Sequence, residues 1–288
     1  MKMSIHSSTL LQTAIKELLR AHIQNPEFEA ELLLAHLLNI PKTHLCSYDF
    51  EINDALQAQF HALINKRKTH YPIQYLLGEW EFWSISLSVS ENVFIPRPET
   101  ETLIELALEY KKSNFSAIID LGTGSGNISL ALAKEFETIP VFAVDISEYA
   151  LHTAQHNTRL HNMHDRIHFV QSDFLSALNP NAFTPPLLIL SNPPYIAAHE
   201  VDSLMDEIKL YEPATSYLAD KGGLDCYLKI FHQLNRWCLS ALYLIFEIAP
   251  QLKDALINIA NKFKFSLQAI KNDLQGNPRA LLFYRGQQ

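Results

Sequence analysis

Residues 117–126 read AIIDLGTGSG, an apolar run followed at once by three closely spaced glycines. The run 117–121 has the length of one buried β-strand, and residues 127–137 have the apolar spacing of a helix. Glycines between a strand and a helix permit positive φ and let backbone N–H groups approach a ligand. The stretch therefore predicts a strand–turn–helix unit with a ligand at the turn.

The chain after Ser116 continues this alternation of strand and helix. Nearly continuous apolar strands that alternate with helices are typical of a parallel, doubly wound sheet. Two further apolar segments flank Gly276-Asn277-Pro278 and predict a terminal antiparallel hairpin. We therefore expect an α/β fold with a mostly parallel, seven-stranded sheet. The other predicted strands are 141–145, 167–171, 187–191, 242–248, 265–271 and 280–285, and the other predicted helices are 99–111, 148–160 and 224–238.

The first 72 residues show a different pattern. Apolar residues recur at helical spacing after Ser7-Ser8-Thr9, which are candidate capping residues. Pro26 suits the first turn of a second helix, and a third helical run covers 53–68. We expect a small all-helical domain at 1–72, a β-hairpin linker at 73–95 and the α/β domain at 96–288.

Composition limits the class of protein. A chain of 288 residues is long enough for two domains. Its net charge of −8 argues against an electrostatic grip on a long nucleic acid, because such proteins usually present a basic face. No apolar run has the length of a transmembrane helix, and the N-terminus reads as an amphipathic helix rather than a signal peptide. We therefore expect a cytoplasmic monomer without a membrane or direct nucleic-acid partner.

The glycine turn predicts the class of ligand. The turn Gly122-Thr123-Gly124-Ser125-Gly126 lacks the glycine spacing of a dinucleotide fingerprint, because position 127 is Asn. A phosphate-binding loop is also excluded, since no Gly-Lys-Ser/Thr follows. A turn of this form preceded by an aspartate suits a ligand without a pyrophosphate, such as S-adenosylmethionine.

Two acids after later strands extend the candidate cofactor site. Asp145 can accept hydrogen bonds from both hydroxyls of a ribose. Asp173 can accept from an adenine amino group, and Phe174 can stack on the adenine ring. Each acid has an alternative role as a helix cap, Asp145 for the helix that begins near Ser147, and the two roles can coexist. We expect both acids and Phe174 to bind S-adenosylmethionine.

The segment Asn192-Pro193-Pro194-Tyr195 follows the fourth strand, at the edge where open α/β sheets bind ligands. An amide nitrogen is a poor nucleophile because its lone pair is delocalised into the carbonyl. The Asn192 side-chain oxygen and a main-chain carbonyl such as that of Pro193 can accept its two N–H groups and direct the lone pair at a methyl group. These acceptors bind more strongly as the nitrogen gains positive charge.

The other members of this segment support that chemistry. The prolines stiffen the turn, and Tyr195 can stack on the planar group. No metal or strong base is needed, because the proton can leave after transfer. We expect Asn192, Pro193 and Tyr195 to be catalytic, Asn192–Tyr195 to bind substrate, and Asn192 also to contact the cofactor.

The tetrapeptide alone leaves the acceptor nitrogen open. Adenine N6 also offers two N–H groups on a planar carbon, so methylation of RNA or DNA is an alternative that needs a channel for a flipped or single-stranded base. A non-enzymatic cofactor-binding scaffold is a third possibility, and an intact Asn192 argues against it.

At these motifs the chain resembles the peptide chain release factor glutamine methyltransferases. Adenine-N6 methyltransferases share the Asn-Pro-Pro-Tyr tetrapeptide but not the segment Ile95-Pro96-Arg97-Pro98-Glu99-Thr100-Glu101. One departure is Ala249-Pro250, where the family usually has Gly after Glu-Ile, and we expect it to alter the turn near the open side of the cofactor. The other matching segments are 74–78, 81–82, 122–126, 143–147, 191–196, 211–213 and 222–225.

The resemblance implies a specific reaction and a specific partner. The reaction is transfer of a methyl group from S-adenosylmethionine to the side-chain nitrogen (N5) of the glutamine in the Gly-Gly-Gln motif of release factors, which modulates translation termination. The resemblance assigns cofactor contacts to 122–126, Asp145, Phe174 and Asn192, and substrate contacts to Asn192–Tyr195. It also implies that the helical domain helps to dock the release factor.

Overall fold

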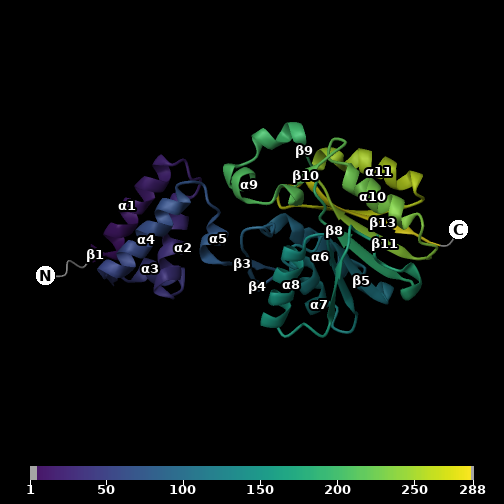
Figure 1. Ribbon diagram of the computed structural model, residues 1–288, viewed down its shortest axis with the longest axis horizontal. Helices are drawn as coiled ribbons and strands as arrows, with labels where there is room; N and C mark the ends of the chain where they lie inside the picture. Colours follow the sequence, from purple (N-terminus) through teal and green to yellow (C-terminus); the bar gives the residue numbers. More distant parts are fainter. Residues whose placement is uncertain (1–4, 287–288) are drawn as a thin grey trace. The chain divides into compact units, whose positions relative to one another are not determined.

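The computed structural model describes residues 5–286, so residues 1–4 and 287–288 of the two outer predicted domains lie outside the description. The chain forms two compact units. Unit 1 contains residues 5–79 together with Met205–Tyr211, and unit 2 contains Trp80–Leu204 and residues 212–286. Within residues 5–286, no helix is both long enough and apolar enough to cross a membrane. Figure 1 labels the helices and most of the strands of both units.

Unit 1 is helical, as the spacing of its apolar residues predicts. Leu10, Leu18, Leu33, Phe60 and Ile64 are fully buried and form its core. A short sheet pairs strand β1 (Ile5–His6) with β2 (Glu51–Ile52). The helices are α1 (Ser7–Arg20), α2 (Pro26–Leu38), α3 (Lys42–Ser47), α4 (Asp54–Arg67), α5 (Ile73–Leu77) and α9 (Asp206–Tyr211).

The start of α1 differs from the prediction. Ser7 and Ser8, predicted as capping residues, lie inside the helix, and the residue at the N-cap position makes no side-chain cap bond. Their hydroxyls donate to the Asp49 carboxylate at 2.9 and 3.1 Å, and the Ser8 backbone N–H donates to it at 3.0 Å. A carboxylate brought in by the fold thus accepts from the Ser8 N–H and from two hydroxyls at this helix end, which local spacing cannot reveal.

The segment predicted as a hairpin linker contains a helix and a hairpin. Residues 73–77 form α5, and Gly78 ends that helix in the left-handed conformation. Strands β3 (Glu79–Phe82) and β4 (Ile85–Ser88) then pair in a two-stranded sheet. Trp83 and Ser84 connect them, both at φ 52°, as a two-residue hairpin turn requires.

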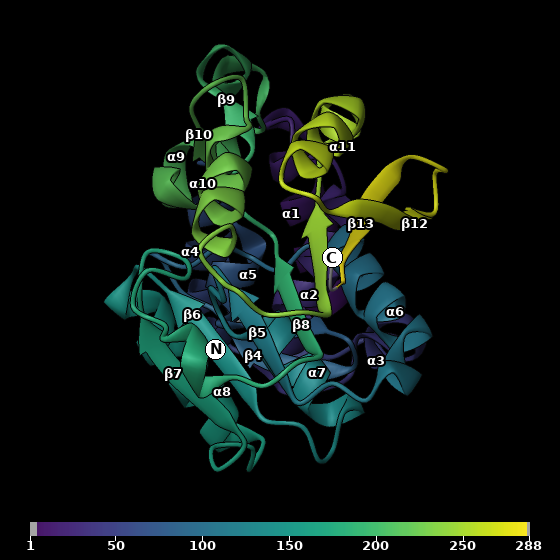
Figure 2. The same cartoon turned by 90° about the vertical axis from the view of Figure 1, so that its right-hand side faces the viewer.

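Unit 2 contains the predicted seven-stranded sheet, in the order β12-β13-β11-β8-β5-β6-β7. The five strands from β11 to β7 are parallel, and β13 is antiparallel to both β11 and β12, which confirms the predicted terminal hairpin. Figure 2 shows β7 and β12 at the two edges. The strands are β5 (Ala117–Leu121), β6 (Val141–Asp145), β7 (Ile167–Gln171), β8 (Leu187–Ser191), β11 (Leu242–Glu247), β12 (Ser266–Asn272) and β13 (Pro278–Arg285).

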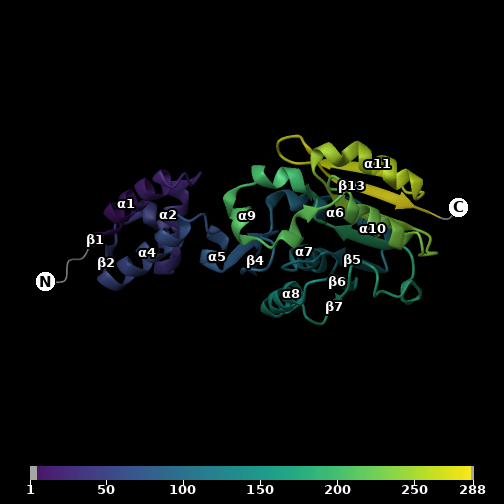
Figure 3. The ribbon, with the colours of Figure 1, turned by 45° about the horizontal axis from the view of Figure 1, so that its top comes forward.

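Helices cover both faces of this sheet. Successive side chains of each strand point to opposite faces, so both faces carry apolar side chains that need cover. Ile119 and Leu121 of β5 pack with α10 and α11, whereas Ile118 packs with α6 and α7. Helix α8 packs against β6 and β7. Figure 2 and Figure 3 show these layers. The helices are α6 (Glu101–Glu109), α7 (Asn127–Glu135), α8 (Glu148–Leu160), α10 (Asp225–Leu234) and α11 (Lys253–Lys262).

The strand order positions the site. After β5 the chain moves to β6 on one side, whereas β8 pairs with β5 on the other side, so the order reverses at the carboxyl end of β5. Ligands of doubly wound sheets bind at such a reversal.

Beyond β8, strand β9 (Ile196–Ala197) pairs with β10 (Leu218–Ala219). Short 3₁₀ turns are η1 (Pro98–Thr100), η2 (Lys111–Ser113), η3 (Pro180–Ala182), η4 (Ala198–Ser203), η5 (Ala214–Ser216) and η6 (Pro250–Leu252).

Candidate active site

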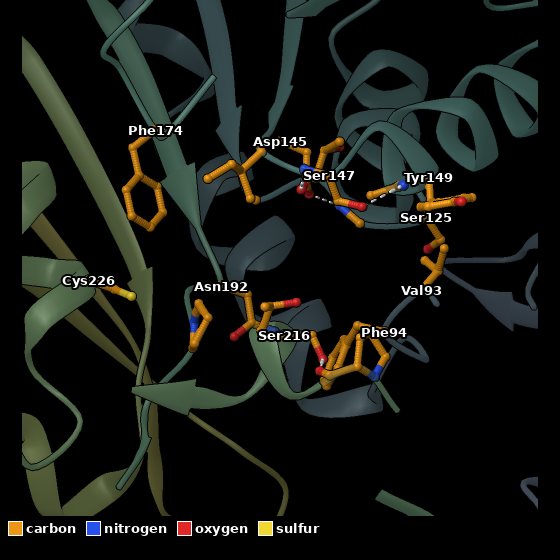
Figure 4. Close-up of a pocket in the computed structure, with 18 of the residues that line it drawn as sticks. Val93, Phe94, Ser125, Asp145, Ser147, Tyr149, Phe174, Asn192, Ser216 and Cys226 are labelled. Atoms are coloured by element: carbon orange, nitrogen blue, oxygen red, sulfur yellow. Dashed lines mark hydrogen bonds between the residues drawn. The ribbon is translucent and has the colours of Figure 1, made fainter. Parts of the chain in front are cut away.

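A cavity of about 530 Å³ lies at the carboxyl ends of β5, β6, β7 and β8. This volume is in the range of small-molecule sites. Figure 4 shows side chains from these strand ends around one open space. Most of the predicted site residues line it, namely Gly122, Thr123, Gly124, Ser125, Asp145, Asp173, Phe174, Asn192 and Pro194, whereas Gly126, Pro193 and Tyr195 lie outside its wall.

Asp120 holds the glycine turn from inside the protein. Its Oδ2 accepts hydrogen bonds from the Thr123 hydroxyl and the Ser129 hydroxyl, both at 2.7 Å. The side chain is fully buried, and burial raises its pKa to about 6. The aspartate that precedes the glycines therefore fixes the turn to the first turn of α7.

Two glycines in this turn have distinct roles. Gly124 lies at φ +55° with open space where a side chain would begin, and its N–H donates to Asp145 Oδ2 at 2.9 Å. Gly126 lies at φ +84°, and a Cβ there would meet Ala154 Cβ of α8 at 3.0 Å. Gly124 thus gives the backbone access to the cavity, and Gly126 permits the close approach of α7 and α8.

Asp145 ends β6 with both oxygens turned to backbone donors. Oδ1 accepts from the Ser147 N–H and Oδ2 from the Gly124 N–H, each at 2.9 Å. Ser147 itself caps α8 through a bond from the Ala150 N–H, so the alternative role of Asp145 as the cap of that helix is wrong. Burial raises the pKa of Asp145, and these N–H groups oppose that shift. Each carboxylate oxygen keeps a second lone pair for a ligand hydroxyl.

Asp173 and Phe174 follow β7 on another wall of the cavity. Asp173 forms an ion pair with Lys229 of α10, which also lines the cavity. The next helical turn after Asp173 is η3 at Pro180, so Asp173 caps no helix among the described elements. Phe174 has φ +50° and lies half-buried against the core. The ion pair holds the Asp173 carboxylate at the wall.

The Asn192 and Tyr195 side chains of the tetrapeptide have different partners. Asn192 lines the cavity, and its Nδ2 donates to the Thr100 hydroxyl at 3.3 Å. This bond leaves Asn192 Oδ1 available as an acceptor. The Tyr195 hydroxyl donates to Glu247 Oε1 at 3.3 Å. Burial and the nearby Glu247 raise the pKa of Tyr195 well above its usual range, so the phenol stays neutral.

The segment 95–101 is fastened to a second segment of unit 2. The Arg97 guanidinium pairs with the Glu212 carboxylate, which is 5% exposed. Glu212 Oε2 also accepts from the Ile95 N–H at 3.3 Å, and Arg97 lies over the Phe94 ring with 4.9 Å to its centroid. The segments 95–101 and 211–213, which the sequence identifies separately, thus contact each other. This contact holds the segment that places Thr100 beside Asn192.

Gly223 shapes the other side of the tetrapeptide. It has φ +88°, and a Cβ there would lie 2.3 Å from the Tyr195 carbonyl oxygen and 3.2 Å from Leu252 Cδ1. No side chain fits in that space. Gly223 therefore lets the chain before α10 pack directly against the backbone of Tyr195.

Sequence reasoning missed several residues of the wall. Phe94, Ile146, Tyr149, Cys226 and Lys229 all line the cavity. Ile146 and Tyr149 are 62% and 70% exposed. Large exposed apolar side chains beside Asp145 are suited to contact a flat ring. In the sequence, an isoleucine directly after a strand-ending acid was the available signal for this part of the wall. Burial raises the pKa of the Cys226 thiol to about 12, so it stays protonated.

The departure at Ala249-Pro250 lies outside the cavity wall. Ala249 is 5% exposed and belongs to the core cluster under α10 and α11. Its φ of −73° is ordinary for any residue, so the turn does not require glycine. Pro250 begins η6, where its fixed φ suits the first position of a helical turn.

The residues present fit S-adenosylmethionine. Gly122 and Gly124 leave the turn without side chains on the cavity side, and a Cβ at Gly122 would reach within 4.0 Å of the Asn192 carbonyl oxygen. Carboxylates suited to hydroxyl or amino groups and apolar side chains suited to an adenine ring line the same space. The cavity volume accommodates a nucleoside with an amino-acid tail.

Comparisons with known proteins match both parts of the chain. The family model of the PrmC N-terminal domain matches residues 9–78, and that of the methyltransferase small domain matches residues 99–242. The hMettl16 catalytic domain, solved in complex with a MAT2A 3′UTR hairpin, shares the fold with a TM-score of 0.53 at 15% identity, over 82% of this chain and 84% of that chain.

Two curated relatives match nearly from end to end. The release factor glutamine methyltransferase of Aliivibrio fischeri is 30% identical over 97% of this chain and 98% of its own length. The release factor glutamine methyltransferase of Dictyoglomus turgidum is 36% identical over 88% of each chain. This chain therefore belongs to the family of release factor glutamine methyltransferases.

Proposed function

We propose that the protein transfers a methyl group from S-adenosylmethionine to the side-chain amide nitrogen (N5) of the glutamine in the Gly-Gly-Gln motif of a release factor, and so modulates translation termination. The observation that carries this proposal is Asn192 at the cavity wall, with its Nδ2 engaged by Thr100 and its Oδ1 available. Membership of the family supports the same reaction.

The residues of this chain act by positioning and by electrostatics. When bound, S-adenosylmethionine supplies an electrophilic methyl group on a sulfonium. Asn192 Oδ1 accepts one N–H of the substrate amide, and the Pro193 carbonyl accepts the other, which turns the nitrogen lone pair toward the methyl group. Both acceptors strengthen as the nitrogen becomes positive. Tyr195 stacks on the planar amide.

The cofactor roles follow the placement of the wall residues. The turn 122–126 approaches the amino-acid part of the cofactor, and Asp145 accepts from the ribose hydroxyls. Asp173 and Phe174 hold the adenine by a hydrogen bond and by stacking. Asn192 also contacts the cofactor.

The partner and location belong to the same proposal. We infer that residues 1–72 dock the release factor, that 73–95 link this domain to the methyltransferase domain at 96–288, and that the enzyme works as a cytoplasmic monomer. The net charge of −8 favours a protein substrate over a long nucleic acid.

The proposal is tested with the full-length protein, methyl-labelled S-adenosylmethionine and three acceptors. These are a release factor, the same release factor with the motif glutamine changed to alanine, and an adenine-containing RNA hairpin. We expect one methyl group on the motif glutamine, located by mass spectrometry, and none on the other two. Transfer to the hairpin without transfer to the release factor would identify an adenine methyltransferase instead.

A further inference from the structure

Thr100 and Glu247 are buried polar residues to which the mechanism above gives no role. Thr100 is 1% exposed and Glu247 is 2% exposed. Glu247 ends β11, which pairs in parallel with β8 so that Phe246 lies opposite Ser191. The next residue on each strand is Glu247 on β11 and Asn192 after β8. The carboxyl group of Glu247 therefore lies at the same sheet edge as the Asn192 amide.

The Thr100 hydroxyl interacts with both of these groups. Its Oγ1 accepts from Asn192 Nδ2 at 3.3 Å. The hydroxyl also favours the charged form of the Glu247 carboxyl group and so lowers the pKa of that group. A hydroxyl has one proton to donate and two lone pairs that accept. The Thr100 oxygen can accept from Asn192 while the hydroxyl proton points toward Glu247.

This direction of donation matters for Asn192. The two ends of a side-chain amide are alike in size, so shape alone does not decide which end faces a ligand. An ionised carboxylate only accepts hydrogen bonds. When Glu247 is ionised and attracts the Thr100 proton, the Thr100 oxygen offers Asn192 a lone pair and selects its NH₂ end. The oxygen end of Asn192 is then the one left for the cavity.

We propose that Thr100 and Glu247 are positioning residues that fix the side-chain amide of Asn192 with its oxygen toward the substrate amide. The inference rests on the proposed function, because it concerns how the substrate N–H is accepted. It assigns a task to the segment 95–101 of unit 2, which the Arg97–Glu212 pair fastens in place.

Glu247 also fixes the second functional side chain of the tetrapeptide. Its Oε1 accepts from the Tyr195 hydroxyl at 3.3 Å. The main-chain carbonyl of Glu247 accepts from the Tyr227 hydroxyl at 2.7 Å, which anchors the end of β11. Glu247 thus bonds Tyr195 directly, and its charge favours the direction of the Thr100 hydroxyl that contacts Asn192.

The surroundings of Glu247 do not favour a purely stabilising role. Burial raises its pKa to about 7, and Glu99 adds to this shift, while Thr100, Arg279 and Tyr195 oppose it. Its Oε2 has no hydrogen-bond partner among residues 5–286. Since a buried and partly unsatisfied carboxyl group costs free energy, an apolar residue would serve the core better.

The first test compares two substitutions at one position, in the full-length enzyme with a release factor as substrate. Thr100→Val removes the hydroxyl but keeps the shape, and Thr100→Ser keeps the hydroxyl. We expect Thr100→Val to lower kcat about tenfold, the scale of one misdirected hydrogen bond, while the affinity for S-adenosylmethionine stays unchanged. Thr100→Ser should keep most of the wild-type kcat.

A double-mutant cycle tests whether Thr100 acts through Asn192. In an Asn192→Ala background the amide to be oriented is gone, so Thr100→Val should have no further effect on kcat. Equal fold losses in the wild-type and Asn192→Ala backgrounds would show that Thr100 acts by another route and would overturn the proposal.

Two other outcomes also decide the question. If Thr100→Val and Thr100→Ser turn over alike, or if both lose cofactor affinity together with kcat, the hydroxyl does not position Asn192. These results are distinct from failure of the proposed function, in which the wild-type enzyme itself transfers no methyl group to the release factor.

Discussion

At the scale of single residues, the proposed chemistry rests on one end of the Asn192 amide. Its NH₂ end is engaged by Thr100, and we propose that its oxygen is the acceptor for substrate. We expect Asn192→Ala to lower turnover by about 10²-fold or more, the scale of losing one preorganised polar contact. Steady-state transfer to a release factor measures turnover, and calorimetric titration with S-adenosylmethionine should show affinity within a few-fold of wild type. Unchanged turnover would remove Asn192 from the mechanism.

The buried carboxyl group of Glu247 should lower the stability of the fold at high pH. Its pKa rises from 4.5 to about 7 on folding. For an acid with a raised pKa, the stability contribution is fully present below pH 4.5 and is lost as the pH rises through about 7. Glu247→Gln removes this loss, so the variant should unfold less readily than wild type at pH 8, by up to about 3 kcal/mol, with a smaller difference at pH 5.

The tryptophans make this measurement specific. Trp80, Trp83 and Trp237 all belong to unit 2, so fluorescence during urea denaturation reports the unfolding of the unit that contains Glu247. A Glu247→Gln variant that is less stable than wild type at pH 8 would mean that the carboxylate stabilises the fold, contrary to this expectation.

At the scale of elements, the tetrapeptide turn is shaped by the chain that enters α10. Gly223 and Gly222 both have positive φ, but only at Gly223 would a Cβ collide with the Tyr195 carbonyl oxygen. Alanine therefore strains the backbone at both positions, and displaces Tyr195 at one. We expect Gly223→Ala to lower kcat about tenfold or more below Gly222→Ala, because small displacements of positioning groups slow transfer steeply.

Gly222→Ala is the matched control for that experiment. Thermal unfolding should show a loss in both variants, since each places a side chain at positive φ. Equal kcat values in the two variants would show that the contact with Tyr195 has no influence on the active site.

At the scale of the whole molecule, the chain contributes to unit 1 twice. Residues 205–211 leave unit 2, form α9 and return at Glu212. Within unit 1, the buried Arg67 pairs with Glu29 of α2 and with Glu207 of α9. The Tyr211 hydroxyl also donates to the Thr69 carbonyl at 2.9 Å. Helix α9 is thus held by contacts that lie more than 130 residues apart along the chain.

Arg67→Ala should release this helix. Removing one partner of a buried ion pair leaves its carboxylates without compensation, so we expect hydrogen exchange in residues 205–211 to become about tenfold faster or more. Lys68→Ala is the control, because Lys68 pairs with Glu17 at the partly exposed surface of the same unit. Unchanged exchange in the Arg67→Ala variant would show that other contacts of unit 1 suffice to hold α9.

The sequence by itself determined the helical first part, the seven-stranded sheet and the parts of the cavity wall directly after β5, β6, β7 and β8. These follow from local physics: apolar residues at a period of 2 or 3.6 specify strand or helix, and glycines specify where a backbone approaches a ligand. It also predicted the chemistry of Asn192, because a planar nitrogen requires acceptors at fixed positions.

Only the tertiary structure decided which distant residues contact the tetrapeptide. Thr100, Glu247 and Gly223 lie far from Asn192 along the chain, and strand order together with the Arg97–Glu212 pair brings them to the tetrapeptide. The Asp49 cap of α1 and the return of α9 to unit 1 have the same origin. A local pattern specifies the element that a residue forms, whereas its partners are set by the packing of the whole chain.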